Sequence, residues 1–287
     1  MLVLSVLAAL LGAMSNAVGT VLQRKAALNV PASHALKPRL FADLARQPVW
    51  VAGIGAVAGA AAFQALALAT GPLALVQPVF ILELPFALMI GSYVLRRRLP
   101  TAGWRAIGYI VVGLAVVLVA AHPHGGNAQA PMVLWIPAIV LGLGLIAGLV
   151  AVARRLPPGA GRAACLGTGS AVANALTAAL MKSAARTFAD DGAVAFLTVW
   201  QTYGFVLCGV LAIVLLENAL QAGPITASQP ALTLGDALVS LLLGVVLYNE
   251  EIGDGWWLLP MGAGLVLIVL GTVRLSRVAS RTRILPS

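Results

Sequence analysis

Long apolar runs separated by short polar or Gly/Pro-containing breaks make up most of this chain. Nine such runs lie near residues 2–22, 48–70, 73–95, 102–121, 131–153, 163–185, 193–216, 224–247 and 256–274. A helix that crosses a bilayer needs about 20 mostly apolar residues. The pattern therefore predicts an all-α, polytopic membrane protein with about nine transmembrane helices. Tight turns are expected at Pro72 and at Gly223-Pro224. The polar segment 23–47 is interpreted as a surface loop, with a short interfacial helix at 40–47.

The first run has an alternative interpretation as a cleaved signal peptide, with small residues near 14–17 as the cleavage site. However, no basic residue precedes this run, and Arg24 and Lys25 follow it directly. That order favours a retained helix whose N-terminus lies outside.

The composition agrees with a membrane protein, because 61% of the residues are hydrophobic and only 9% are charged. A soluble core of this size cannot hide so much apolar surface. The net charge of +9 indicates either nucleic-acid binding or basic loops that face the cytoplasm. The positions of the charges decide between these two.

With the N-terminus outside, 16 of the 18 Lys and Arg residues fall in the inner segments, and only Lys182 and Arg186 fall outside. The positive-inside rule therefore predicts a multi-pass protein of the cytoplasmic membrane, with the N-terminus outside and the C-terminus in the cytoplasm. No nucleic-acid partner is expected. Tryptophans near the predicted helix ends fit an aromatic belt: Trp50, Trp104, Trp135, Trp256 and Trp257.

An internal repeat divides the chain. Residues 67–72 read ALATGP and residues 219–224 read ALQAGP, and Gln77-Pro78 matches Gln229-Pro230 at the same offset. The predicted topology gives the two copies opposite orientations, and inverted repeats with proline-interrupted helices are typical of secondary transporters. We expect a first repeat at 1–125, a second at 126–275 and a basic cytoplasmic tail at 276–287.

Two acidic residues lie near the centres of apolar runs, Glu83 in the third and Asp236 in the eighth. A charge in the middle of a bilayer is costly, and such groups face a cavity or a partner. A low-dielectric site favours the protonated form of a carboxyl group, which suits proton coupling or cation binding. The alternative is a neutral, hydrogen-bonded structural role for each.

Polar residues recur at helical spacing on several runs and predict a wet central cavity. The eighth run carries the longest stripe: Thr226, Gln229, Thr233, Asp236 and Ser240. Candidate substrate-lining or ion-binding residues beside the two acids are Gln64, Gln77, Gln229, Asn16, Asn174, Gln201, Tyr203 and Thr233. Small polar residues also pack membrane helices together, so each has a structural alternative. The fifth run has no polar residue in its middle and is expected to be peripheral.

Lys182 lies near the outer end of the sixth run. Its side chain either reaches to the interface or sits in a cavity opposite an acid or an anionic substrate. The chain has no GxxxxGKS/T, HExxH or GxSxG motif, and we expect neither an enzyme nor a cofactor. Cys165 and Cys208 have no metal or redox spacing, and the two histidines His122 and His124 make a weak metal site.

Several short motifs resemble the drug/metabolite transporter (DMT) superfamily, and within it the NIPA-like magnesium transporters. Residues 50–53 and 75–78 look like that family's WWAG…LVTP stretch, and residues 218–220 and 228–230 resemble its NKAL…VSP signature. Residues 21–25 resemble the basic end of its first helix, and 169–182 its sixth helix, which carries a lysine. The resemblance implies nine or ten helices in inverted repeats and alternating-access transport.

The chain departs from the magnesium transporters at three positions. Ala61 and Gln64 stand where that family has an acid and an asparagine, and Arg97 replaces the Glu expected after the third run, whereas Glu250 is kept. Mg²⁺ is usually bound through one or two carboxylates, so these changes weaken a magnesium assignment.

The sequence supports three hypotheses: a secondary transporter of a small solute, with possible proton coupling; a divalent-cation transporter or channel; and a non-transporting membrane scaffold. Its partners would be the solute or cation and the lipid bilayer, with the chain acting as a monomer or homodimer. The metal, if any, is unknown.

Overall fold

The computed structural model describes residues 2–28, 47–94, 99–122, 124–253 and 255–282. Within them, nine helical segments are long and apolar enough to cross a membrane, as predicted. The protein is thus a multi-pass helical membrane protein. The helices are α1 (Leu2–Leu28), α3 (Pro48–Thr70), α4 (Leu73–Phe80), α5 (Glu83–Val94), α6 (Thr101–Ala121), α7 (Met132–Arg155), α8 (Ala160–Thr198), α9 (Trp200–Ala222), α10 (Ile225–Tyr248) and α11 (Leu258–Thr282).

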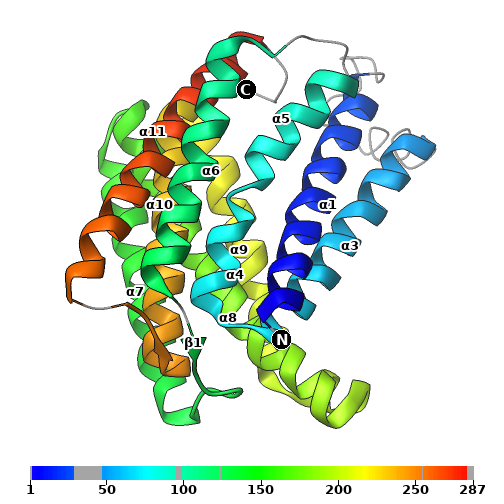
Figure 1. The fold of residues 1–287 in the computed structure, drawn as a ribbon, viewed down its shortest axis with the longest axis vertical. Helices are drawn as coiled ribbons and strands as arrows, with labels where there is room; N and C mark the ends of the chain where they lie inside the picture. Colours follow the sequence, from blue (N-terminus) through cyan, green and yellow to red (C-terminus); the bar gives the residue numbers. More distant parts are fainter. Residues whose placement is uncertain (1, 29–46, 95–98, 123, 254, 283–287) are drawn as a thin grey trace.

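The first residue of α1, Leu2, and the last residue of α11, Thr282, lie at opposite ends of the bundle (Figure 1). We call the end that carries Leu2 and a short β-ribbon the N-terminal end, and the end reached by the last turns of α11 the C-terminal end. The ribbon consists of β1 (His124–Gly125) and β2 (Glu250–Glu251), which pair antiparallel with Gly125 opposite Glu250. A 3-10 turn at Gly255–Trp257 then leads into α11.

Closely packed helix pairs build the bundle. Helix α1 packs antiparallel along α3, α8 along α9 and α6 along α11, whereas α8 and α10, two spans apart, pack in parallel. Hydroxyl groups connect the first two pairs, because Ser15 Oγ donates to the Ala56 carbonyl at 2.7 Å and Ser170 Oγ donates to the Ala212 carbonyl at 2.7 Å. The α6–α11 pair comes close at two glycines, Gly113 and Gly264.

The third apolar run forms a broken helix. Helix α4 ends at Phe80 and α5 begins at Glu83, with 3-10-type bonds from Ile81 N–H to Pro78 and from Leu82 N–H to Val79. Pro85 causes the break, because it has no N–H for the Ile81 carbonyl and its ring clashes with that carbonyl in a continuous helix. The tight turns expected at Pro72 and Gly223-Pro224 are confirmed, since each proline precedes the first residue of the following helix.

Helix α8 is the most buried span and α7 the most exposed, so the peripheral position expected for the fifth run is confirmed. The boundary between the sixth and seventh runs needs correction. Helix α8 extends to Thr198 across a kink at Gly192, whose φ of 84° lies in the left-handed region. Helix α9 therefore begins only at Trp200, rather than near 193.

Three further predictions, for the polar loop, the C-terminal tail and the tryptophan belt, can be compared with the structure. The loop assignment is wrong for residues 23–28, because α1 continues to Leu28; the interfacial helix expected at 40–47 lies almost entirely outside the described residues. Helix α11 runs to Thr282, into the segment assigned to the tail. The belt position expected for Trp135 is wrong, because Trp135 is 1% exposed and packs edge-on against Trp200 at 5.4 Å between ring centroids. Trp104 and Trp256 are exposed, as a belt requires.

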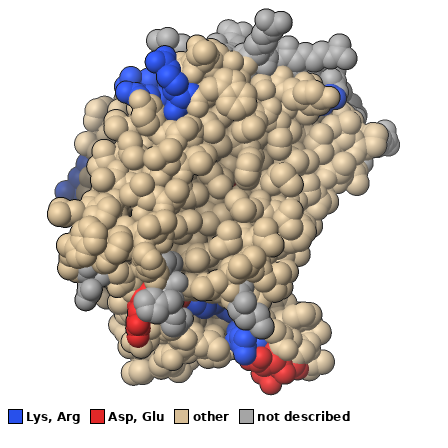
Figure 2. Space-filling view, viewed as in Figure 1, with Lys and Arg blue, Asp and Glu red and all other residues tan. Residues whose placement is uncertain are grey.

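Charged and uncharged residues occupy different parts of the surface. Figure 2 shows flanks that are almost free of charge, with Lys and Arg mainly near the C-terminal end and Asp and Glu only at the N-terminal end of this face, where some basic side chains also lie. Such a belt without charges is what lipid-facing surface requires.

Candidate functional site

Glu83 occupies the first turn of α5, directly after the break in the third span. Its carboxyl group forms a side-chain hydrogen bond with Asn16 of α1. Both side chains are half-buried, whereas the neighbouring residues Ala17 and Leu82 are buried. The structure thus brings together two of the residues that the sequence analysis had selected separately.

Asp236 has a corresponding arrangement on α10. Asn174 Nδ2 of α8 donates to Asp236 Oδ2 at 3.2 Å, and Ser240 Oγ donates to Oδ1 at 3.3 Å. Ser240 lies one turn along the polar stripe predicted for this helix. The carboxyl group therefore has a partner on a neighbouring helix and another on its own, which orients it inside the bundle.

Two glutamines meet near the break. Gln64 Nε2 of α3 lies 3.5 Å from Gln77 Oε1 of α4, at the limit of a hydrogen bond. Gln77 is 1% exposed, and its Nε2 has no hydrogen-bond partner among the described residues. A buried amide donor without a partner costs free energy and needs an explanation, such as a bound water or ligand.

The remaining candidates divide between inside and outside. Gln229 and Thr233 are half-buried on α10, as is Gln201 on α9, whose Oε1 has no partner within the described part of the chain. Tyr203 does not fit the predicted site, because it is 60% exposed and its hydroxyl donates to the Leu197 carbonyl at 2.8 Å. It sits on the outward face of α9.

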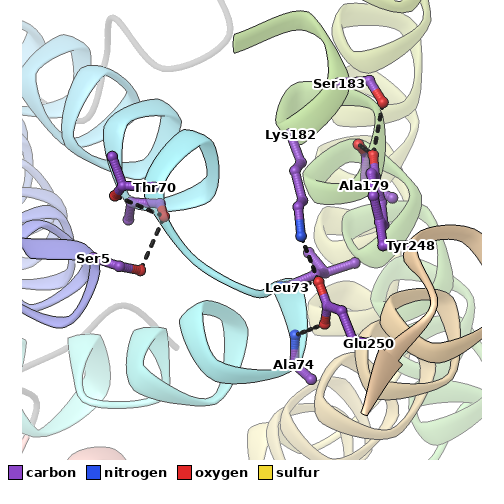
Figure 3. Close-up of polar contacts among 10 residues, drawn as sticks. Ser5, Thr70, Leu73, Ala74, Ala179, Lys182, Ser183, Tyr248 and Glu250 are labelled. Atoms are coloured by element: carbon purple, nitrogen blue, oxygen red, sulfur yellow. Dashed lines mark hydrogen bonds and ion pairs between the residues drawn. The ribbon is translucent and has the colours of Figure 1, made fainter. Parts of the chain in front are cut away.

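Lys182 is buried and ion-pairs with Glu250, so its side chain does not reach to the interface (Figure 3). This confirms the alternative in which Lys182 faces an acid. Glu250, with a fully buried side chain, also accepts the backbone N–H of Leu73 at 2.6 Å and of Ala74 at 2.9 Å. It therefore satisfies two free donors at the N-terminus of α4, where the helix dipole also favours a negative charge.

Tyr248 supports this ion pair from the last turn of α10. The Lys182 Nζ atom lies 4.3 Å from the centre of its ring, and its hydroxyl donates to the Ala179 carbonyl at 2.6 Å and lies 2.8 Å from Ser183 Oγ. Trp135 packs edge-on against the same ring, with centroids 6.5 Å apart. The cluster thus joins α4, α7, α8, α10 and the ribbon at the N-terminal end.

A cavity of about 270 Å³ opens beside this cluster. Its lining includes Lys182 and Arg186 of α8, Thr70 at the end of α3 and Asn127 after the ribbon. Neither Glu83 nor Asp236 lines it. The deep carboxyl groups and the N-terminal cluster are therefore two separate sites.

The candidate site residues chosen from the sequence did not include Glu250. Its match to the motif of the magnesium transporters that the chain resembles was a signal, but its position in a polar segment between two apolar runs is typical of a solvated loop residue. Among the described residues, no group of three or more His, Cys, Asp or Glu is placed to hold a metal ion.

The fold and these two sites define a multi-pass helical membrane protein that holds ionisable side chains inside its bundle. The chain is similar to an uncharacterized protein of Corynebacterium glutamicum, with 29% identity over 283 residues that cover 96% of each chain. No protein-family model matches the chain. No solved structure matches it. Inferences about function therefore rest on the sites themselves.

Proposed function

We propose that this protein is a secondary-active transporter of a small solute, of the drug/metabolite transporter type, and that the solute or coupling ion is a cation. One observation carries the proposal. Two carboxyl groups lie within apolar spans, and each is held by an asparagine from a neighbouring helix, Glu83 by Asn16 and Asp236 by Asn174. Carboxyl groups at such depth are costly and mark ion or substrate pathways.

The charge balance supports a cationic ligand. Lys182, a basic residue buried within a span, already has Glu250 as its counter-ion. Glu83 and Asp236 have hydrogen-bond partners that are neutral amides and a hydroxyl. An incoming cation or proton would therefore supply the positive charge that these carboxylates lack.

The transporter mechanism would be alternating access between two inverted repeats. Three features support this layout: the α1–α3 and α8–α9 pairs use the same kind of serine-to-carbonyl bond, α6 and α11 pack against each other at Gly113 and Gly264, and the third span is broken at Glu83. Broken helices near the midplane are where secondary transporters bind ions and substrates. We place the N-terminus outside and the C-terminus in the cytoplasm, because basic residues favour the C-terminal end.

The proposal is tested in two stages. First, metals, amines and organic anions are screened for thermal stabilisation of the purified protein, and we expect cations to stabilise it and anions not to. Second, uptake of the stabilising cation is measured in proteoliposomes with Asp236→Asn. We expect background uptake. Asp190→Asn is the matched control, because Asp190 is an exposed partner of Arg186 just before the kink in α8. Normal uptake by Asp236→Asn would refute the assignment.

A divalent-cation transporter is the second candidate, favoured by the oxygen ligands that the two acids and their asparagines offer. Metal-dependent uptake without a proton gradient would support it. A non-transporting scaffold predicts that neither amines nor metals stabilise the protein.

A further inference from the structure

A second cavity, of about 460 Å³, lies at the C-terminal end between α6 and α11. Its described lining consists of Ala102, Arg105 and Tyr109 from α6 and Arg274, Arg277 and Val278 from α11, and includes no Asp or Glu. The Arg274 guanidinium lies 4.7 Å from the centre of the Tyr109 ring. Three arginines thus converge on one cavity, and neither of the carboxyl groups proposed for transport lines it.

This convergence is fixed by the backbone. Helices α6 and α11 approach so closely that a Cβ atom on Gly113 would lie 2.7 Å from the Gly264 carbonyl oxygen. Because the two helices are packed against each other, the backbone positions that carry their arginines lie close together. Arg105 and Arg274, one from each helix, both line the cavity, so an anion that binds between them is attracted by both charges.

The chemistry of the lining fits a phosphate group. A guanidinium offers a planar set of donors that matches phosphate oxygens in a bidentate way, and Arg274 is further oriented by the Tyr109 ring. Ala102 lies in the first turn of α6, where backbone N–H groups and the helix dipole also favour an anion.

The level of the cavity relative to the membrane surface indicates the source of the phosphate. Trp104, which is 52% exposed, lies next to Arg105 in the same turn. Exposed tryptophans sit at the level of lipid headgroups. A basic pocket between helices at this level is the kind of site that binds anionic lipid headgroups. We propose that the cavity binds the phosphate group of an anionic phospholipid from the leaflet at the C-terminal end.

The test uses the full-length protein in a neutral detergent, with binding of phosphatidylglycerol and phosphatidylcholine followed by native mass spectrometry. We expect preferential binding of phosphatidylglycerol. The Arg105→Gln/Arg274→Gln double variant should weaken it about 30-fold, about fivefold for each arginine. The matched control is Arg154→Gln/Arg155→Gln, which removes the same charge from exposed positions at the end of α7 and should retain the preference.

Three results would overturn the proposal: equal binding of the two lipids, an equal loss in the control, or displacement of phosphatidylglycerol by millimolar inorganic phosphate, which would assign the cavity to a free phosphate. If the double variant does not fold, Arg105→Gln alone replaces an exposed side chain, and its expected loss is about fivefold. Failure of this test leaves the transport proposal unchanged, because the arginines take no part in it.

Discussion

The two halves of the chain, before and after residue 125, use the same carboxyl–asparagine pairing but differ at their ends. In the second half, Lys182 of α8 ion-pairs with Glu250 after α10. At the corresponding place in the first half the sequence has Arg24 and Lys25 after the first run and Arg96 to Arg98 after the third, with no acid beside them. Within the described residues, the buried Lys182–Glu250 ion pair ties the N-terminal end, whereas the sequence places basic residues after the first and third runs.

The third spans also differ. Pro78 and Pro230 correspond, but the position that holds Pro85 in the first half holds Ala237 in the second. Helix α10 consequently runs unbroken from Ile225 to Tyr248 in spite of Pro230, whereas α4 and α5 are separate. The first half has a break at its acid, and the second half has a rigid helix. Under the proposed transport function, we therefore expect movement to be concentrated in the first half.

The largest effect is expected from the deep acid of the first half. If both carboxyl groups act in transport, Glu83→Gln should reduce uptake to background, as expected for Asp236→Asn, because an amide cannot supply the negative charge that a cation requires. The measurement is uptake in proteoliposomes, normalised to inserted protein. Loss in only one of the two variants would show that the halves are not equivalent, and would assign the other acid to a structural role.

The second expectation concerns the ion pair. Lys182→Met leaves the Glu250 carboxylate buried with only the two backbone donors of α4, and we expect a loss of about 3–5 kcal/mol in the free energy of unfolding. Denaturation by SDS in mixed micelles measures it.

Two variants sharpen this result. Lys25→Met, at the other end of the comparison, removes an exposed lysine and should change stability by less than about 0.5 kcal/mol. The double variant Lys182→Met/Glu250→Gln should be more stable than Lys182→Met, because it leaves no unpaired charge. A double variant that is less stable would contradict the assignment of Glu250 as counter-ion.

Features that depend on neighbouring residues could be predicted from the sequence, whereas features that depend on contacts between distant residues could not. The nine spans and the proline turns depend on neighbouring residues, so hydropathy and Gly/Pro positions were sufficient. The Lys182–Glu250 pair joins residues 68 positions apart, and no local pattern distinguishes Glu250 from a solvated loop acid. Trp135 was likewise misplaced, because a position near a helix end predicts a belt residue unless a neighbouring helix covers it.

The deep acids show an intermediate case. Their depth in apolar runs identified Glu83 and Asp236, and helical spacing identified Asn16 and Asn174. Which amide meets which acid was not predictable, because it depends on the packing of α1 against α5 and of α8 against α10. The prediction for Tyr203 was wrong for the same reason. The sequence does not show which face of α9 is directed toward the other helices.

The third expectation exchanges the proline between the halves. Ala237→Pro should destabilise the protein by about 3 kcal/mol, because proline removes a bond and clashes inside the continuous α10. Pro85→Ala should cost no more than about 1 kcal/mol, since alanine fits the first turn of a helix. SDS denaturation compares the two. Equal costs would contradict the view that the break in the third span depends on Pro85.

The smallest expected effect concerns two glycines at the contact between α6 and α11, one from each half of the chain. Gly113 of α6 and Gly264 of α11 fall within one residue of corresponding positions in the two halves, and each would place an added Cβ atom within 2.8 Å of the other's carbonyl oxygen. Gly113→Ala and Gly264→Ala should therefore cost similar amounts, about 1–3 kcal/mol each, through overpacking of a close helix contact. Their costs should not add in the double variant, because once one methyl group has pushed the helices apart, the second meets less resistance.

Gly108→Ala, on α6 with open space around it, is the control and should leave stability unchanged or slightly higher. Unequal single costs, or full additivity, would show that the two helices do not meet as equivalent partners, and would count against a pseudo-twofold relation between the halves.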